Sequence, residues 1–348
     1  MIAVLIVLIS ILNFTGCSIE SNKNRYDAQF LVLFNTATKI VGYAETKEEF
    51  SGYSQMIYDE LKKYHELYDI YNNYDDVNNI KTINDNAGIS PVKVDKKIID
   101  LLSYGKEAYA NTDGKVNIAM GAVLRVWHKY RQEGSEDPTI AKLPDMEVLQ
   151  EKNTHTDIDK LIIDEENSTV YLEDPEMSLD VGAIAKGYAT EQVSHYAYEN
   201  GFKNGMISVG GNVRTIGEKV GKEKSWNVGI QNPDSESDQK NLYILNLKDK
   251  SLVTSGDYER YYTVDGVKYH HIINPKTLMP SNYFTAISII TKDSGFADEL
   301  STAVFNMPFE EGLSFIENIS DTEALWVFKD GSMKSSSGFS DYIHNEKE

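Results

Sequence analysis

The chain lacks three features that would place it in a familiar class of protein. It has one cysteine among 348 residues, so no disulfide can form within a single chain. It has no apolar run near the ~20 residues of a membrane-spanning helix. It is also poor in basic residues, with 34 Lys plus Arg against 54 Asp plus Glu, and its formal charge of −20 argues against nucleic acid as a partner. Any ligand phosphate must therefore be held by backbone amides, a local lysine or a metal.

The longest apolar run covers residues 2–14, which is the length of a signal-peptide core. It leads into the sequence FTGC, which resembles a bacterial lipobox, where the cysteine becomes a lipidated N-terminus after cleavage. No basic residue precedes the run, and a buried Cys17 in an apolar helix is the alternative. We expect a lipoprotein signal peptide at 1–16, a tether lipid-anchored through Cys17 at 17–27, and one domain at 28–345.

Hydrophobic spacing predicts the secondary structure of the remainder. Apolar residues three and four apart predict helices over 48–68, 98–109, 123–130, 183–199 and 296–305. Hairpins are predicted at 161–172 and 206–217, and at 261–273, where Asp265-Gly266 is a strong turn signal. The polar, proline-containing residues 132–153 are expected to form a surface excursion. Strands joined by hairpins, with helices between groups of them, predict an α+β fold.

Residues 180–187, DVGAIAKG, read as a strand that runs through a glycine turn into a helix. The free amides of a helix start attract anions, and Lys186 adds a charge, so this segment could hold a diphosphate. It matches neither a Walker loop nor a dinucleotide-binding fingerprint. A plain joint between strand and helix remains the alternative.

Residues 254–302 contain a second group of candidates. Asp298 and Thr302 stand four residues apart, so on a helix both oxygens point the same way, and Mg²⁺ needs few protein oxygens. The alternatives are that Asp298 only interacts favourably with the helix dipole and that Thr302 only packs in the core. His270 and His271 alternate faces on a strand, so only one can enter a pocket. His271 is the candidate for proton transfer, with a structural role as its alternative.

Five blocks of the chain resemble, in order, the motifs of the FAD:protein FMN transferase family, the ApbE family of bacterial flavin transferases. The blocks are LDVGAIAKGYA, ISVGGNV, VTSGDYERYY, YHHIINPKTLMP and FADELSTAVF. The resemblance implies a T-fold-like α+β fold with mixed, largely antiparallel sheets and flanking helices. It also implies a Mg²⁺-dependent enzyme that transfers FMN from FAD to a Ser or Thr hydroxyl of an acceptor flavoprotein and releases AMP.

The same resemblance assigns roles to residues. It makes the side chains of Asp298 and Thr302 and the backbone carbonyl of Ala183 the metal ligands, and His271 the base that deprotonates the incoming hydroxyl. Because the chain is acidic, we expect no basic patch that could replace the metal. The resemblance further implies contacts with FAD from Phe34, Asn117, Ile118, Ala119, Asp180, Lys186, His271 and Ile272.

The chain departs from the family at one turn, where the usual DPRTG reads NPKTL over residues 274–278. Leucine in place of glycine predicts that the turn does not need a positive φ at position 278. Tyr71 lies in a stretch that can cap the flavin ring, although the local match there is weak.

Two further functions fit the same motifs. Hydrolysis of FAD to FMN and AMP would use the same metal and nucleotide contacts, with water in place of the hydroxyl. A lipoprotein that binds flavin without turnover is the other. For each of these functions we expect a location on the extracytoplasmic face of the bacterial cell membrane, held there by the lipid anchor.

Overall fold

The computed structural model describes residues 10–11, 22–31 and 33–344 of the chain. The predicted lipidation site Cys17 and most of the predicted signal peptide lie outside these residues. Among the residues described, no helix is both long and apolar enough to span a membrane.

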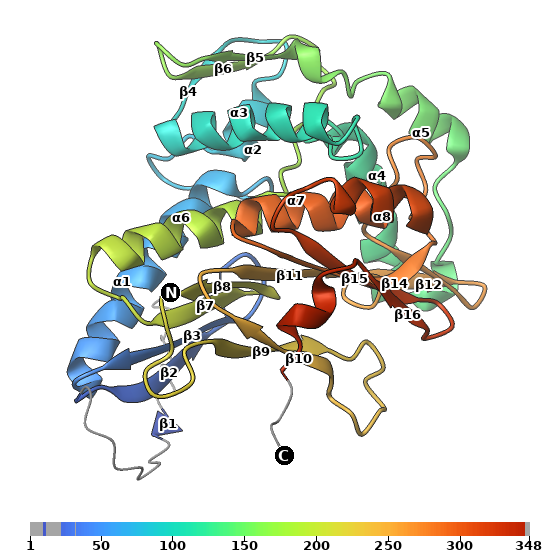
Figure 1. Cartoon of the computed structure of the whole chain (residues 1–348). Coiled ribbons are helices and arrows are strands. Elements are labelled where there is room, and N and C mark those ends of the chain that lie inside the picture. The colour runs from blue at the N-terminus through green and yellow to red at the C-terminus, as the bar shows by residue number, and fades with distance from the viewer. Residues whose placement is uncertain (1–9, 12–21, 32, 345–348) are drawn as a thin grey trace.

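A nine-stranded antiparallel sheet forms the centre of the structure (Figure 1). Its order is β1-β2-β3-β7-β8-β11-β14-β15-β16. The strands are β1 Ser10–Ile11, β2 Asn24–Phe30, β3 Thr38–Ala44, β7 Gly205–Val209, β8 Asn212–Ile216, β11 Ser251–Gly256, β14 Phe284–Thr291, β15 Glu323–Phe328 and β16 Met333–Ser335. β14 reads FTAISIIT and is almost wholly buried, because both faces of the sheet are covered. The predicted α+β class is confirmed.

The start of the sheet corrects one predicted boundary. β2 begins at Asn24 and pairs along its whole length with β3, from Asn24 opposite Ala44 to Phe30 opposite Thr38. Residues 24–27, predicted as part of a tether, are therefore strand. The polar composition hid the strand, because at this end only alternate residues such as Tyr26 and Ala28 face the core.

Helices cover one face of the large sheet. Figure 1 shows α6 (Ala185–Glu199) and α7 (Ser294–Phe305) lying over the sheet, with α1 (Lys47–Tyr68) beside them. α1 begins at the Thr46 cap, whose hydroxyl accepts from the Glu49 amide at 3.1 Å, and it buries the predicted apolar stripe. α6 and α7 cross at Gly187, where a Cβ atom would overlap the Ser294 carbonyl and the Asp298 side chain.

A two-stranded sheet covers the opposite face. β9 (Trp226–Gln231) and β10 (Asn241–Leu247) pair antiparallel and lie across the large sheet from α6 and α7 (Figure 1). Trp226, Val228 and Ile230 alternate with exposed residues along β9. They form a second core with Val41 and Leu252 of the large sheet. The alternating apolar residues of β9 therefore hold the small sheet against the large one.

The remaining elements build an outer layer around the helices. They comprise α2 Ile80–Asp85, β4 Val92–Lys93, α3 Lys96–Asn111, α4 Gly121–Glu136, α5 Met146–Asn153, β5 Leu161–Asp164, β6 Thr169–Leu172, β12 Tyr261–Val264, β13 Val267–His270 and α8 Phe309–Glu317. Residues 132–153 are mostly exposed, as expected of a surface excursion, and they contain the end of α4 and all of α5. Asp145 caps α5 and Leu149 is its one buried residue, so the helical periodicity is weak.

Candidate functional site

A cavity of about 750 Å³ opens beside the start of α6, the turn between β7 and β8, and α7. Its wall draws on segments far apart in the chain, from residue 29 to residue 302. Most of the predicted site residues line it, namely Phe34, Asn117, Asp180, Ala183, Lys186, His271, Ile272, Asp298 and Thr302. The fold therefore brings the separate motifs to one place.

Asp298 is a buried carboxyl group of this cavity, and its side chain is 5% exposed. One of its oxygens, Oδ2, accepts a hydrogen bond from the Gly187 amide at 2.8 Å. The other, Oδ1, lies 3.7 Å from the Lys186 amine. Burial raises the pKa of Asp298, while Lys186 and the Gly187 N–H act in the opposite direction. Asp298 thus keeps one oxygen that no backbone amide engages.

Thr302 follows Asp298 by one helical turn on α7, and both side chains line the cavity. Ala183 reaches the same cavity from the turn that precedes α6. A carboxylate, a hydroxyl and a carbonyl are hard oxygen donors, the type that Mg²⁺ prefers. The donor set and the half-engaged carboxylate of Asp298 therefore fit a magnesium ion.

The two adjacent histidines have different surroundings, as predicted, although β13 ends at His270 and His271 lies just beyond the strand. His270 is 3% exposed, its Nε2 donates to the Ser281 carbonyl at 2.6 Å, and its Nδ1 accepts from the Ile272 amide at 3.2 Å. His271 lines the cavity, and its Nδ1 is buried without a hydrogen-bond partner among the residues described. Burial, assisted by Arg260 and Arg131, lowers the pKa of His271 to about 3. Its imidazole is therefore neutral at pH 7 and able to accept a proton.

Phe34 and Asn117 stand at the cavity wall for identifiable reasons. Phe34 and Asn35 both have positive φ, 53° and 52°, and the Phe34 amide donates to His65 Nδ1 at 3.3 Å. This turn places the Phe34 ring edge-on to the His65 ring, with centroids 5.6 Å apart. The Asn117 side chain accepts from the Ala119 amide at 2.8 Å and donates to the Thr156 carbonyl at 3.0 Å.

Two predicted contacts are not on the cavity wall. Ile118 and Ala119 are both fully buried and belong to the main core. The carbonyl of Ile118 accepts from the Asp180 amide at 2.8 Å, so this residue positions a neighbour that does line the cavity. Short apolar runs of this kind do not reveal which residue faces a ligand. The FAD contacts implied for Ile118 and Ala119 stay predictions, and their side chains pack in the core.

Two arginines to which the sequence analysis assigned no role also line the cavity. Arg131 comes from α4 and Arg260 from the loop before β12. The cationic residues of the wall outnumber its carboxylates by five to four, with Lys39, Lys115, Arg131, Lys186 and Arg260 against Asp69, Asp180, Glu259 and Asp298. The wall is therefore close to neutral, although the chain as a whole carries a formal charge of −20.

Aromatic and polar rings surround the arginines. Tyr71 is 51% exposed and lies against His128, with ring centroids 5.1 Å apart. The His128 Nδ1 is 3.2 Å from an Arg131 guanidinium nitrogen. Both Tyr71 and His128 line the cavity. A planar ligand ring therefore has an exposed aromatic surface at this wall.

The turn at residues 274–278 also differs from its prediction. Leu278 has a φ of 60°, so the turn keeps a left-handed residue although no glycine is present. The Leu278 amide donates to the Asn274 carbonyl at 2.8 Å, and its own carbonyl accepts from Trp127 Nε1 at 2.9 Å. Its side chain is 5% exposed and packs in a cluster with Trp127. Burial and these two bonds hold the leucine in a conformation it would otherwise avoid.

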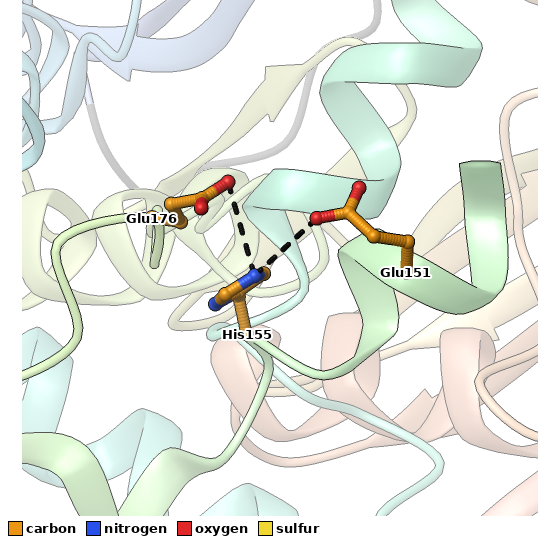
Figure 2. Close-up of side chains that lie close together, drawn as sticks. All are labelled: Glu151, His155 and Glu176. Atoms are coloured by element: carbon orange, nitrogen blue, oxygen red, sulfur yellow. Dashed lines mark ion pairs between the residues drawn. The ribbon is translucent and has the colours of Figure 1, made fainter.

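A second group of potential metal ligands lies away from the cavity. Figure 2 shows Glu151, His155 and Glu176, whose ligand atoms lie within 4.8 Å of one another. The Lys152 amine stands 3.2 Å from Glu151 and 2.7 Å from Glu176. Asp174 accepts from His155 Nδ1 at 3.0 Å. An ammonium group already balances the two carboxylates, so we treat this group as a surface ion network.

Comparison with known proteins agrees with the geometry. The model of the ApbE family matches residues 34–326. A FAD:protein FMN transferase of Klebsiella pneumoniae is 30% identical over 274 residues, 78% of this chain and 81% of its own length. One from Treponema pallidum is 32% identical over 277 residues, 76% of this chain and 74% of its own.

Solved structures show the same fold. The crystal structure of the ApbE protein of Thermotoga maritima superposes with a TM-score of 0.81 at 27% identity, covering 92% of this chain and all of that one. The flavin transferase ApbE of Vibrio cholerae gives a TM-score of 0.75 at 23% identity, covering 92% of this chain and 99% of that one, a likeness of fold. With its five motifs gathered around one cavity, the chain belongs to the ApbE family.

Proposed function

We propose that this protein is a flavin transferase that moves FMN from FAD to a Ser or Thr hydroxyl of an acceptor protein and releases AMP. One observation carries the proposal: the neutral imidazole of His271 shares a cavity with the Asp298 and Thr302 oxygens and with three strong cations. The curated relatives carry the name of this activity. A diphosphate ester, a base and a site for a cation are the parts that such a transfer requires.

The step balances as a phosphoryl transfer. The acceptor oxygen forms a bond to the phosphorus of the FMN half of FAD. The bond from that phosphorus to the bridging oxygen breaks, and AMP leaves with that oxygen. The hydroxyl proton passes to the neutral His271 imidazole. Lys186, Arg131 and Arg260 line the cavity and hold the diphosphate by its charge.

Magnesium is part of the proposal. Asp298, Thr302 and the carbonyl of Ala183 would hold it. When bound, the ion would neutralise charge on the diphosphate and on the departing phosphate. Burial of Asp298 beside the Gly187 amide fixes the direction of its carboxylate, so the ligand is in place before the ion arrives.

We also propose attachment to the outer face of the cell membrane through a lipid on Cys17. The sequence FTGC after a short apolar run supports this location. The start of β2 at Asn24 would leave residues 18–23 as the link between the lipid and the sheet. With a net charge of −20, the domain itself would not adsorb to anionic lipid.

The test is covalent labelling of proteins. Purified enzyme is incubated with FAD, MgCl₂ and an extract of extracytoplasmic proteins, then denatured and separated on a gel. We expect a fluorescent flavin band at an acceptor, a gain of the FMN mass on one of its Ser or Thr residues, and AMP in equal amount. His271→Ala and Asp298→Asn should lose the band. Release of AMP with no labelled protein would instead identify a hydrolase, and FAD binding without AMP a flavin-binding protein.

A further inference from the structure

β9 carries a free edge beside the cavity. Among the strands that the structure describes, it pairs with β10 alone. Gly229 lies opposite Ile244, and the Ile244 carbonyl accepts from the His344 amide at 2.7 Å on the far side of β10. Because Ile244 bonds outward, its pair with Gly229 is a non-hydrogen-bonded one, and the N–H and C=O of Gly229 point away from β10.

Alternation along the strand gives Asn227 the same orientation. The Asn232 amide, three residues beyond Gly229, donates to the Lys240 carbonyl at 3.0 Å, which agrees with this alternation. No other segment of the described chain bonds to the backbone of Asn227 or Gly229. The N–H and C=O groups of Asn227 and Gly229 thus point outward from the edge of β9. An added strand would form its backbone hydrogen bonds with such groups.

A groove of about 690 Å³ runs along this edge. Its floor includes Lys39, Ser208 and Val213, which are cross-strand neighbours on β3, β7 and β8. These three residues, with Gly229 and Gln231, also line the cavity that contains His271. Asn227 lines the groove but not the cavity. The groove therefore leads from the middle of β9, past Gln231, into the site.

We infer that the edge of β9 binds the acceptor protein as an added, extended strand, so that its Ser or Thr lies beyond Gln231 at the cavity. This inference rests on the proposed function. Recognition through backbone groups suits an enzyme whose partner offers an extended segment. The exposed Lys39 at the floor of the groove favours an acidic residue within that segment.

The test uses peptides in place of the acceptor protein. A library of ten-residue peptides, each with one Thr, is incubated with the enzyme, FAD and MgCl₂, and peptides that gain the FMN mass are identified. The best of them is added to ¹⁵N-labelled enzyme. We expect slower hydrogen exchange at the amides of Asn227 and Gly229, and no change at Val228, whose amide already bonds to β10.

Substitutions separate the backbone from the side chain. Asn227→Pro removes an edge N–H, whereas Asn227→Ala keeps it. Loss of one such hydrogen bond should lower kcat/KM for the peptide about three- to tenfold in the proline variant alone. Ser335→Pro, on the edge strand β16 at the end of the large sheet, is the matched control and should change nothing. The Kd for FAD should be equal in all four proteins.

Other results would overturn the inference. A peptide that is labelled without slowing hydrogen exchange at the β9 amides would place the acceptor elsewhere. Equal effects of proline and alanine at position 227 on kcat/KM would do the same. In both cases the transferase activity stands. Labelling of proteins in an extract but of no peptide would show that an extended segment is insufficient. Light scattering could show that the protein is a dimer and that the Asn227→Pro variant is a monomer. That result would assign the edge of β9 to a second copy of the chain. Absence of labelling in both experiments would refute the proposed function itself.

Discussion

Glu299 gives the protein a dependence of stability on pH that can be worked out from its surroundings. The side chain lies on α7 and is fully buried. Tyr104 donates a hydrogen bond to its Oε2 at 2.6 Å, while Oε1 has no partner among the residues described. Burial raises the pKa of Glu299 from 4.5 to about 7, and Asp293 and Glu107 add to the rise.

The sign follows from linkage. Because the folded protein holds this proton more tightly than the unfolded chain, the contribution of Glu299 to the free energy of unfolding is greatest below pH 4.5. It falls as pH rises to about 7. The difference, 7 − 4.5 = 2.5 in pKa, corresponds to about 3 kcal/mol. Glu299→Gln removes the ionisable group and keeps an acceptor for Tyr104. At pH 8 we expect the variant to be more stable than the parent by up to about 3 kcal/mol.

The assay is urea unfolding followed by tryptophan fluorescence at pH 5, 6, 7 and 8. The quantity of interest is the difference between variant and parent, in which the titration of all other groups cancels. Glu310→Gln, at an exposed position on α8, is the control and should show no dependence on pH. A difference between Glu299→Gln and its parent that is constant from pH 5 to 8 would refute the reasoning.

Three further predictions concern the cavity and its turn. The His271 imidazole should not titrate between pH 8 and 5, because its pKa is lowered to about 3; ¹H–¹⁵N spectra of the side chain would show a protonation there if the idea is wrong. Arg131→Ala and Arg260→Ala should each weaken FAD binding about tenfold or more in fluorescence titrations, whereas Lys129→Ala, on the exposed side of α4, should not; equal affinities would remove the arginines from the site. Leu278→Gly should lower the free energy of unfolding by about 1–3 kcal/mol, since lost burial outweighs relief of the positive φ; a more stable variant in urea would show that strain dominates.

Local spacing predicted the parts of the site that lie within one element. Asp298 and Thr302 share a helix face because they are four residues apart. Strand alternation predicts that His270 and His271 separate, although β13 ends at His270. Both statements depend on backbone geometry alone. The pair from α7 and Lys186 from α6 could be joined only through the family resemblance, because no local rule brings those helices together.

The missed features depend on tertiary contacts. Arg131 lies on the helix α4, and nothing in its sequence marks it as facing a cavity rather than solvent. Leu278 keeps a positive φ because of its burial against Trp127, a residue 151 positions away. Ile118 reads like a motif residue but is held in the core. Only packing distinguishes these cases.

The crossing of α6 and α7 at Gly187 links the reactivity of this enzyme to its folding. The Gly187 amide donates to Asp298, and the missing side chain lets the preceding residue, Lys186, approach the same carboxylate. Loop variation can change which protein the enzyme modifies, but it cannot retune this charge pair, which is embedded in the helix layer. Heating or mutation that loosens the crossing should therefore disrupt this pair, and with it the proposed magnesium site, before the sheet melts.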